Sequence, residues 1–427
     1  MSKKIANLIL VSALGCAGFS QAHAASAEEA PRSHLFDENI DFDVGYKGDI
    51  IATTSGGNRR GTTYLDNLDL KLTVNAEGLW GWNGVTLFLH GLSNHGGKPN
   101  AHYAGTAQGI DNIEVTTNTS KLYQAWIQKS LLNDRVSLLA GLYDLNSEFY
   151  VTDTSALFLH PSPGIGSEFA QTGQNGPSIF PTTSAAFRVK AQPTSDYYLQ
   201  AAVFDGVPGD PNNPKGTHIQ FNSGDGALLI VEAAYLRGDH GQAFLSDRDR
   251  DDKSLEPFGK YAVGVWHYTA KFDDLLDTDD EGNPVRRGKN SGVYFLAEQS
   301  VYREADDSTQ GINVFARYGV ANSDINRFAH YLHLGAVYTG LIPGRDSDQA
   351  GFSLGVAHNG SKYREAQLNE GAVTDHDEIG LELTYRAQVT HWLAIQPDIQ
   401  YVINPDTNPD LQNATIVGIR FEVSLEQ

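Results

Sequence analysis

One pentapeptide has the residue types and spacing of a catalytic nucleophile. Residues Gly351 to Gly355 read G-F-S-L-G and match the G-x-S-x-G elbow, which presents a serine in many hydrolases. That elbow requires a strand, a strained turn and then a helix. Here the alternation of larger apolar and small residues continues past Gly355 to Ala357, and no helical pattern follows. The segment therefore favours an ordinary strand over a hydrolase site.

Two acidic runs resemble the start of a calcium-binding loop. Residues 277–282 read D-T-D-D-E-G, but the twelfth position is Gly288 instead of the glutamate that such a loop needs. The run Asp247, Asp249 and Asp251 lacks glycine at its sixth position. The 14 His are scattered without ligand spacing, and no phosphate-binding or dinucleotide-binding motif occurs. The sequence predicts no metal site, no cofactor and no enzyme activity.

The composition excludes several other functions. The chain has 427 residues, with 52 Asp and Glu against 31 Lys and Arg, so its formal net charge is -21. Such an acidic chain is a poor partner for nucleic acid, which is bound through clustered Lys and Arg. The single Cys excludes a disulfide framework. Because no apolar run reaches about 18 residues, a helical membrane protein is also excluded.

The stretch 144–183 combines side chains that suit carbohydrate chemistry. Sugars present hydroxyls, which hydrogen-bond to carboxylates and amides, and an apolar face, which stacks on aromatic rings. The hydrogen-bonding residues of the stretch are Glu148, Asp153, His160, Glu168, Gln171, Gln174 and Asn175. Its aromatic residues are Phe149, Tyr150 and Phe158. The alternative is a solvated surface loop whose aromatic rings pack on neighbouring elements.

The elements that must position these residues are strands. Stretches of eight to twelve residues alternate apolar and polar side chains, as in a strand with two different faces. In the last stretch, Val417, Ile419 and Phe421 alternate with Arg420 and Glu422. Those near 121, 227 and 260 alternate poorly. We count about sixteen segments, starting near residues 42, 67, 85, 121, 135, 184, 196, 227, 260, 291, 311, 329, 350, 378, 392 and 415.

The connections between these segments distinguish a membrane barrel from a soluble sandwich. They alternate in length, as in bacterial outer-membrane barrels with short periplasmic turns and long outer loops. Full charges of both signs at mid-strand also suit a water-filled lumen better than a packed core. We therefore predict an all-β, transmembrane antiparallel barrel of about 16 strands. The predicted periplasmic turns are 78–84, 130–134, 192–195 and 390–391. The predicted outer loops are 53–66, 93–120, 144–183, 205–226, 270–290 and 359–377. The connection 237–259 is an exception, because it is long but falls on the periplasmic side.

The first residues have the features of an export signal. Lys3 and Lys4 precede an apolar stretch, and Ala22-His23-Ala24 forms a small-x-small cleavage site. We predict a signal peptide over 1–24, a short periplasmic segment over 25–40 and a barrel domain over 41–427. The sole Cys, Cys16, falls within the signal.

Six separated blocks are similar to the carbohydrate-selective porins of the OprB type. They are 68–84, 141–149, 203–209, 316–319, 340–345 and 396–405, and the similarity runs from about residue 36 to the end. The resemblance implies a sixteen-stranded barrel in the outer membrane of a Gram-negative bacterium, inserted by the β-barrel assembly machinery and surrounded by lipid and lipopolysaccharide. It also implies that 144–183, the third outer loop, folds inward. The chain departs from this class by ending in Leu425-Glu426-Gln427 instead of an aromatic residue.

Charged residues on the polar phase of the strands form a second candidate set. Opposed rows of Arg and carboxylate across a pore set its ion preference. The alternative is a row of cross-strand ion pairs that only solvate the wall. Trp80, Trp82 and Trp392 lie beside predicted turns and are expected at a membrane interface. The wall residues are Lys47, Lys71, Arg188, Lys190, Arg317, Arg386 and Arg420, with the acids Asp69, Glu77, Glu298, Glu382, Asp398 and Glu422.

Together with the resemblance, these features predict a porin for passive, selective diffusion of sugars, and the resemblance implies monosaccharides of the glucose type. Two alternatives stay open. One is a porin for polyhydroxylated acids, such as sugar acids or cyclic hydroxy acids, because the row of Arg and Lys would admit anions. The other is an exported soluble β-rich glycan-binding protein or glycosidase. The sequence leaves open whether the protein is a monomer or a homo-oligomer.

Overall fold

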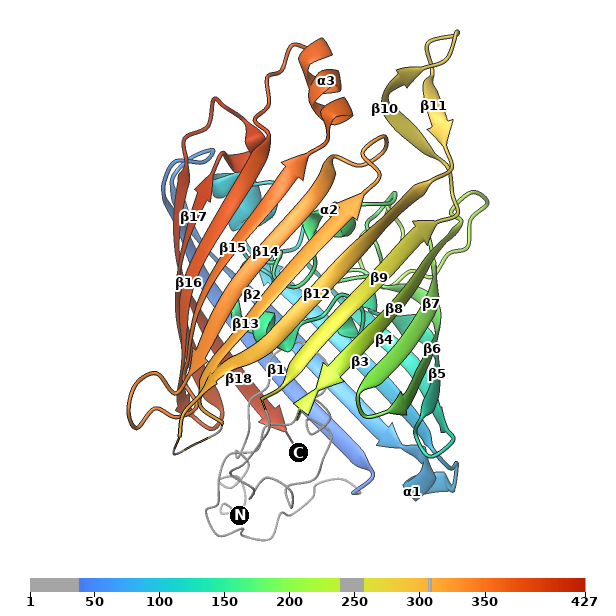
Figure 1. Cartoon of the computed structure of the whole chain (residues 1–427), viewed down its shortest axis with the longest axis vertical. Helices are drawn as coiled ribbons and strands as arrows, with labels where there is room; N and C mark the ends of the chain where they lie inside the picture. The colour runs from blue at the N-terminus through green and yellow to red at the C-terminus, as the bar shows by residue number, and fades with distance from the viewer. Residues whose placement is uncertain (1–37, 239–256, 306, 308, 427) are drawn as a thin grey trace, which may run out of the picture.

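The computed structural model describes residues 38–238, 257–305, 307 and 309–426, and its main feature is a closed barrel of sixteen antiparallel strands (Figure 1). The barrel closes where the first and last strands pair, with Ile50 opposite Ile419. Its strands are β1 (Ile40–Ser55), β2 (Gly61–Asn75), β3 (Val85–Gly96), β4 (Thr119–Leu131), β5 (Val136–Tyr143), β6 (Ser184–Thr194), β7 (Tyr197–Asp205), β8 (Ala227–Arg237), β9 (Gly259–Tyr268), β12 (Asn290–Arg303), β13 (Gly311–Ala321), β14 (Phe328–Thr339), β15 (Gln349–Asn359), β16 (Asp377–Thr390), β17 (Leu393–Ile403) and β18 (Ala414–Glu426).

The remaining regular elements lie in the connections. Strands β10 (Phe272–Thr278) and β11 (Pro284–Arg287) form a separate hairpin, so β9 pairs directly with β12. The helices are α1 (Ala76–Trp80), α2 (Ser167–Ala170) and α3 (Ser361–Asn369), and 3₁₀ turns cover Leu145–Ser147, Asp153–Leu157 and Pro405–Thr407. A π-helical turn covers Asn100–Ala104. Among the described residues, none of the helices has the length and apolar character to cross a bilayer.

The predicted fold is confirmed. Each of the sixteen predicted segments holds one barrel strand, and the largest difference in a starting residue is at β2, which begins at Gly61 instead of near 67. The first outer connection is therefore shorter than expected. The hairpin of β10 and β11 was not predicted, because it lies within an expected loop. The predicted signal 1–24 and most of the segments 25–40 and 237–259, including Asp247, Asp249 and Asp251, lie outside the described residues.

Alternation along the strands separates two surfaces of the barrel. Apolar side chains such as Phe295, Phe352 and Leu383 are exposed on the outside, where they suit contact with lipid. Charged and amide side chains on the same strands point inward. Closing the sheet leaves no strand edge, so backbone groups are paired all the way round.

The weak alternation of β8 and β9 has a structural cause. Leu229 and Val231 are exposed on the outside of β8, whereas Leu228 and Ile230 point inward and are buried. Both faces are apolar because the inner face packs against a loop inside the barrel. A strand that is buried by protein on one side and by lipid on the other has no polar phase to display.

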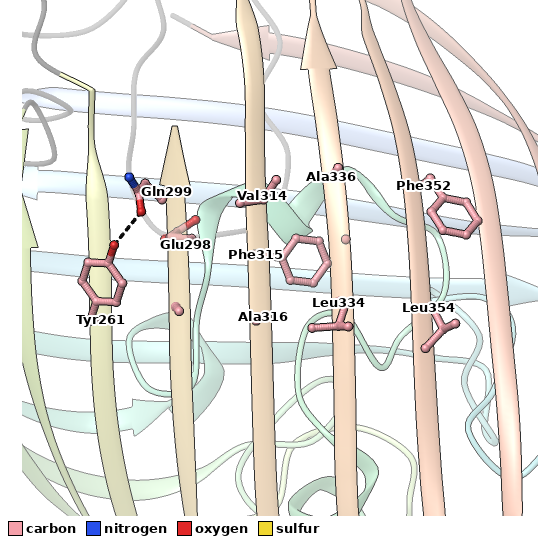
Figure 2. Close-up of a pocket in the computed structure, with 12 residues that line it drawn as sticks. Tyr261, Glu298, Gln299, Val314, Phe315, Ala316, Leu334, Ala336, Phe352 and Leu354 are labelled. Carbon is pink, nitrogen blue, oxygen red and sulfur yellow. Dashed lines mark hydrogen bonds between the residues drawn. The ribbon is translucent and has the colours of Figure 1, made fainter. Parts of the chain in front are cut away.

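A shallow concavity with a volume of about 550 Å³ lies on the outward surface of β9 and β12 to β15 (Figure 2). Tyr261, Leu334 and Phe352 border it, and each has an exposed apolar ring or chain on the outward phase of its strand. It therefore faces the membrane side of the barrel and is not part of the lumen.

An ion cluster joins three loops at the outer end of the barrel. The Lys362 ammonium from α3 lies 2.8 Å from carboxylates of Asp274 and Asp277 on β10, and 3.0 Å from Asp324. Burial alone would raise the pKa of Asp274, but hydrogen bonds from Lys362, two backbone amides and Arg287 hold it well below its usual range. Asp277, in the run that resembled a calcium loop, is paired with Arg287 at 2.7 Å.

Candidate functional site

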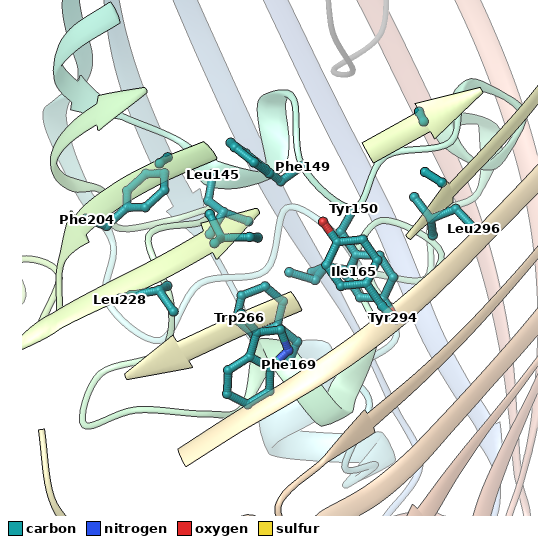
Figure 3. Close-up of a cluster of buried hydrophobic side chains, with 14 of the residues drawn as sticks. Leu145, Phe149, Tyr150, Ile165, Phe169, Phe204, Leu228, Trp266, Tyr294 and Leu296 are labelled. Atoms are coloured by element: carbon teal, nitrogen blue, oxygen red, sulfur yellow. The ribbon is translucent and has the colours of Figure 1, made fainter. Parts of the chain in front are cut away.

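The loop 144–183 lies inside the barrel, as the resemblance implied. Its apolar side chains pack against the inward faces of β7, β8, β9 and β12 (Figure 3). Phe169 stacks on Trp266 with ring centroids 4.7 Å apart, and Tyr150 stacks on Tyr294 at 4.1 Å. The inner wall is therefore apolar at β7, β8, β9 and β12, where a polar wall was expected. The cluster includes Leu145, Phe149, Tyr150, Ile165, Phe169, Phe204, Leu228, Ile230, Trp266, Tyr294 and Leu296.

Glutamates on the wall accept hydrogen bonds from the backbone of this loop. Glu232 on β8 accepts from the Tyr150 amide at 2.9 Å. Glu298 on β12 accepts from the amides of Asp153 and Thr154 at 3.2 and 3.0 Å. Buried amides need such acceptors, because the loop has no sheet partner there. These carboxylates therefore position the loop.

The opposite side of the loop is held in the same way by β13 and β16. Glu382 accepts from the amides of Leu159 and His160, at 2.6 and 3.2 Å. Arg317 donates to the Gly164 carbonyl at 2.7 Å and to the Thr152 hydroxyl at 2.8 Å. Because Arg317 and Glu382 are both buried and bound to the loop, neither presents its charge to a solute.

The G-x-S-x-G segment is part of the inner wall that contacts the loop. Residues 351–355 continue β15 without a turn, so the predicted strand is confirmed. Gly351 points inward, and a Cβ built there would lie 2.6 Å from Cδ2 of Leu157. Small residues on this face of β15 let the loop approach the wall closely.

A second loop, 97–118, also folds inward, which sequence reasoning did not predict. Glu378 on β16 accepts from the amides of Ala107 and Gln108, at 2.7 and 2.9 Å. Ile110 and Ile113 are buried against the wall. The apolar pattern of Ile110, Ile113 and Val115 in an otherwise polar loop is the signal that would have indicated burial.

Arg420 connects this second loop to the closing strands. It forms a two-pronged pair with Asp49, with contacts of 2.9 and 2.6 Å, and donates to the Asn112 side chain at 2.7 Å. Asn112 in turn donates from its amide to the Leu159 carbonyl at 2.7 Å. The two inward loops are thus joined to each other, and together they narrow the lumen.

Glu148, Arg188 and Lys190 form an ion cluster in which Glu148 and Lys190 retain access to the lumen. The Glu148 carboxylate lies 2.8 Å from Arg188 and 3.6 Å from Lys190. The side chains of Glu148 and Lys190 are 24% and 27% exposed. Burial would raise the pKa of Glu148, but Lys190 and Arg188 outweigh that effect and lower it. The cluster therefore offers a carboxylate and an ammonium to a solute at neutral pH.

The rest of the predicted set is distributed differently. Asp153 is exposed, and Arg386 is paired with Glu422 at 2.8 Å. Asp398 is buried and accepts from Gln400 at 2.9 Å. Glu77 lies on α1 in a turn and not on the lumen wall, so its predicted phase was wrong.

The three aromatic rings predicted to contact sugars do not present their faces to the lumen. Phe149, Tyr150 and Phe158 are buried, because they form the loop's contact with the wall. Glu168 is buried beside the Tyr150 hydroxyl at 2.8 Å, and burial raises the pKa of Glu168 to about 7. His160 is also buried, which lowers its pKa to about 4. These five buried residues therefore stabilise the conformation of the loop and do not contact a solute in the lumen.

Sequence reasoning missed three wall residues beside the exposed ion cluster. Gln128 on β4 accepts from Arg188 at 2.7 Å, and the Tyr143 hydroxyl donates to Glu148. Trp126 lies two residues before Gln128 on the same inward face. The weak alternation of β4 hid this phase, although Gln124, Trp126 and Gln128 follow each other at a spacing of two.

Comparison with known proteins agrees with this architecture. Residues 59–425 match the family model described as carbohydrate-selective porin, OprB family. Porin B of Pseudomonas aeruginosa is 26% identical over 455 residues, covering 96% of this chain and 95% of that protein. A high-pH structure of Pseudomonas putida OprB has a TM-score of 0.76 and 21% identity, covering 90% of this chain and 94% of that one. The low-pH structure of the same protein has a TM-score of 0.56 and 18% identity, covering 90% and 92%.

The family match spans most of the chain, and the closed barrel with two inward loops has the form of a diffusion channel. The family match excludes the alternative of a soluble glycan-binding protein or glycosidase. The chain belongs to the OprB family of carbohydrate-selective porins, which are non-enzymatic channels in the outer membrane of Gram-negative bacteria.

Proposed function

We propose that this porin passes monosaccharides of glucose size, and that Glu148 and Lys190 make the selective contacts with them. The observation that supports this is the partial exposure of this pair in a lumen where Glu382 and Arg317 are engaged by the inward loop. A carboxylate accepts from sugar hydroxyls, and an ammonium donates to them. Because Glu148 and Lys190 are only 3.6 Å apart, a hydroxyl can bridge both groups.

A second candidate is a channel for polyhydroxylated acids. Lys190 is held by Glu148 at a distance too long for a strong hydrogen bond, so an anionic solute would compete for it. Lys71 on the inward phase of β2 adds positive charge to the same lumen. Under this alternative the ammonium groups, and not Glu148, determine selectivity.

Single-channel current in a planar bilayer separates these candidates. We expect glucose to block the current at lower concentration than its acid analogue gluconate. Glu148→Gln removes the carboxylate charge and should weaken the block by glucose several-fold, whereas Asp210→Asn in an outer loop should not. Stronger block by gluconate, lost in Lys190→Met, would transfer the assignment to hydroxy acids.

We also infer the surroundings of the mature chain. The outward band of exposed apolar side chains supports contact with outer-membrane lipid and lipopolysaccharide. We also propose cleavage after Ala24 and insertion by the β-barrel assembly machinery, because an exported barrel requires both steps. Mass spectrometry of the purified membrane protein would identify its first residue.

A further inference from the structure

Tyr198 is a wall residue whose ring contacts a charged group. It lies on the inward phase of β7, because its neighbour Tyr197 is 54% exposed on the outside. The Lys190 ammonium on β6 lies over the Tyr198 ring, 5.0 Å from the ring centroid. Lys190 is the cross-strand partner of Gln200, so Tyr198 is its diagonal neighbour, which an aromatic side chain can reach. A cation in this position is attracted by the face of the ring.

The ring of Tyr198 is held in a fixed position. Its hydroxyl donates to Glu232 at 2.7 Å. Glu232 also accepts from the Tyr294 hydroxyl at 2.6 Å and from the Tyr150 amide at 2.9 Å, so this carboxylate is itself held by β12 and by the inward loop. Tyr198 also packs in the buried cluster between the loop and the wall. The ring therefore cannot rotate away from Lys190.

Glu232 also fixes the backbone of Glu148. Gln200 lies two residues after Tyr198 on the same face of β7, and its side-chain amide donates to Glu232 and to the Glu148 carbonyl, both at 3.0 Å. The contact of 3.6 Å between Lys190 and the Glu148 carboxylate is too long for a strong hydrogen bond, so it does not by itself hold the ammonium. The spacing of the two charged groups is therefore set by their common anchor on β7 and β8.

We propose that Tyr198 is a positioning residue for selectivity, which holds the Lys190 ammonium beside the Glu148 carboxylate where a solute hydroxyl can bridge them. This inference rests on the proposed function and adds the residue that fixes the spacing of its contacts. Tyr198 does not touch the solute, because only 8% of it is exposed. The Lys260 ammonium, 6.0 Å from the same ring centroid, donates to the Val151 carbonyl at 2.8 Å and is held by the loop instead.

Block of single-channel current by glucose tests this role. Tyr198→Leu removes the ring face and should raise the glucose concentration that gives half block about fivefold, which corresponds to about 1 kcal/mol. Tyr198→Phe keeps the ring face and should be blocked at nearly the same concentration as the unaltered protein. Tyr197→Leu removes the adjacent tyrosine on the outward face, and this matched control should leave the block unchanged.

Two further measurements separate positioning from packing. If Tyr198 acts through Lys190, Tyr198→Leu should have no further effect in a protein that already carries Lys190→Met, and an equal additional loss there would overturn the proposal. Pentafluorophenylalanine at position 198 keeps the shape of the ring but withdraws charge from its face, so it should weaken the block even if Tyr198→Leu does not fold. Unchanged block in the fluorinated protein would also overturn the proposal. Heat-modifiable migration in gel electrophoresis verifies that each variant is a folded barrel.

The outcomes distinguish this inference from the proposed function. If glucose blocks the unaltered protein and Tyr198→Leu at the same concentration, the positioning role alone is refuted. If gluconate blocks and glucose does not, the proposed function fails, and weaker block by gluconate in Tyr198→Leu would still support the positioning of Lys190. If neither solute blocks the current, both fail.

Discussion

Removing the Glu298 carboxylate should release one segment of the inward loop while the barrel stays intact. This side chain accepts from the amides of Asp153 and Thr154 and from the Thr154 hydroxyl at 3.0 Å. Hydrogen bonds to a charged group contribute roughly 1.5–3 kcal/mol each, and Glu298→Ala would leave both amides without this acceptor. A loss of about 3 kcal/mol raises the open population of the segment roughly 100-fold.

A single cysteine reports this opening. Leu157 is buried in the same segment, and the predicted mature chain has no other thiol, so Leu157→Cys carries the only reactive site. Labelling by a water-soluble maleimide tracks the open population when opening and closing are fast. We expect labelling to be slow with Glu298 present and roughly 100-fold faster in Glu298→Ala.

The control is Glu304→Ala. Glu304 follows the last residue of the same strand, β12, and its carboxylate accepts from the Tyr338 hydroxyl instead of from the loop. It should leave the labelling rate unchanged. Equal labelling rates with and without Glu298 would refute the idea that wall carboxylates hold the loop. Equal acceleration by both variants would instead indicate general loosening of the barrel.

Three other perturbations follow from the same contacts. Asp49→Ala removes the nearest carboxylate of the buried Arg420 and leaves only Asp111, at 3.7 Å. It should destabilise the barrel by about 3 kcal/mol, measured as a lower urea midpoint, and an unchanged midpoint would contradict the role of the pair. Because the folded pKa of Asp274 is depressed, its stabilisation is full above about pH 4 and is lost as pH falls through the folded pKa. Hydrogen exchange in 272–287 should therefore accelerate on acidification, and in Lys362→Met it should already be fast at neutral pH. Gly319→Val should displace the loop, because a Cβ there would lie 1.7 Å from Oε1 of Glu168; near-UV circular dichroism would report the lost aromatic packing, and an unchanged spectrum would contradict it.

The sequence predicts the barrel well because a two-faced strand has a period of two that any lipid-facing segment must keep. It predicts less where the inner face is covered by protein. At β8 the inward Leu228 and Ile230 pack on the loop, so the polar phase is absent and alternation fails as a guide. The strand was still found, because apolar length and flanking turn residues remain.

Site residues were harder to predict than strands. Residue type and strand phase placed Arg317 and Glu382 on the inner wall, where the structure also has them. Their partners, however, are loop amides and carbonyls distant in the chain, and no local pattern encodes such contacts. The same is true of Tyr150, whose ring suits a sugar by chemistry but is buried by packing. Access to the lumen is a property of the folded loops.

We expect this lumen to select carbohydrates through contacts with its wall and not only through its width. Swelling of liposomes that contain the purified protein tests it most directly, with glucose compared with a neutral oligo(ethylene glycol) of similar mass. We predict that glucose enters faster, and that Glu148→Gln reduces this preference. Equal rates for the two solutes, or an unchanged preference in Glu148→Gln, would contradict the account, because a lumen that acts only by its width would not distinguish the solutes.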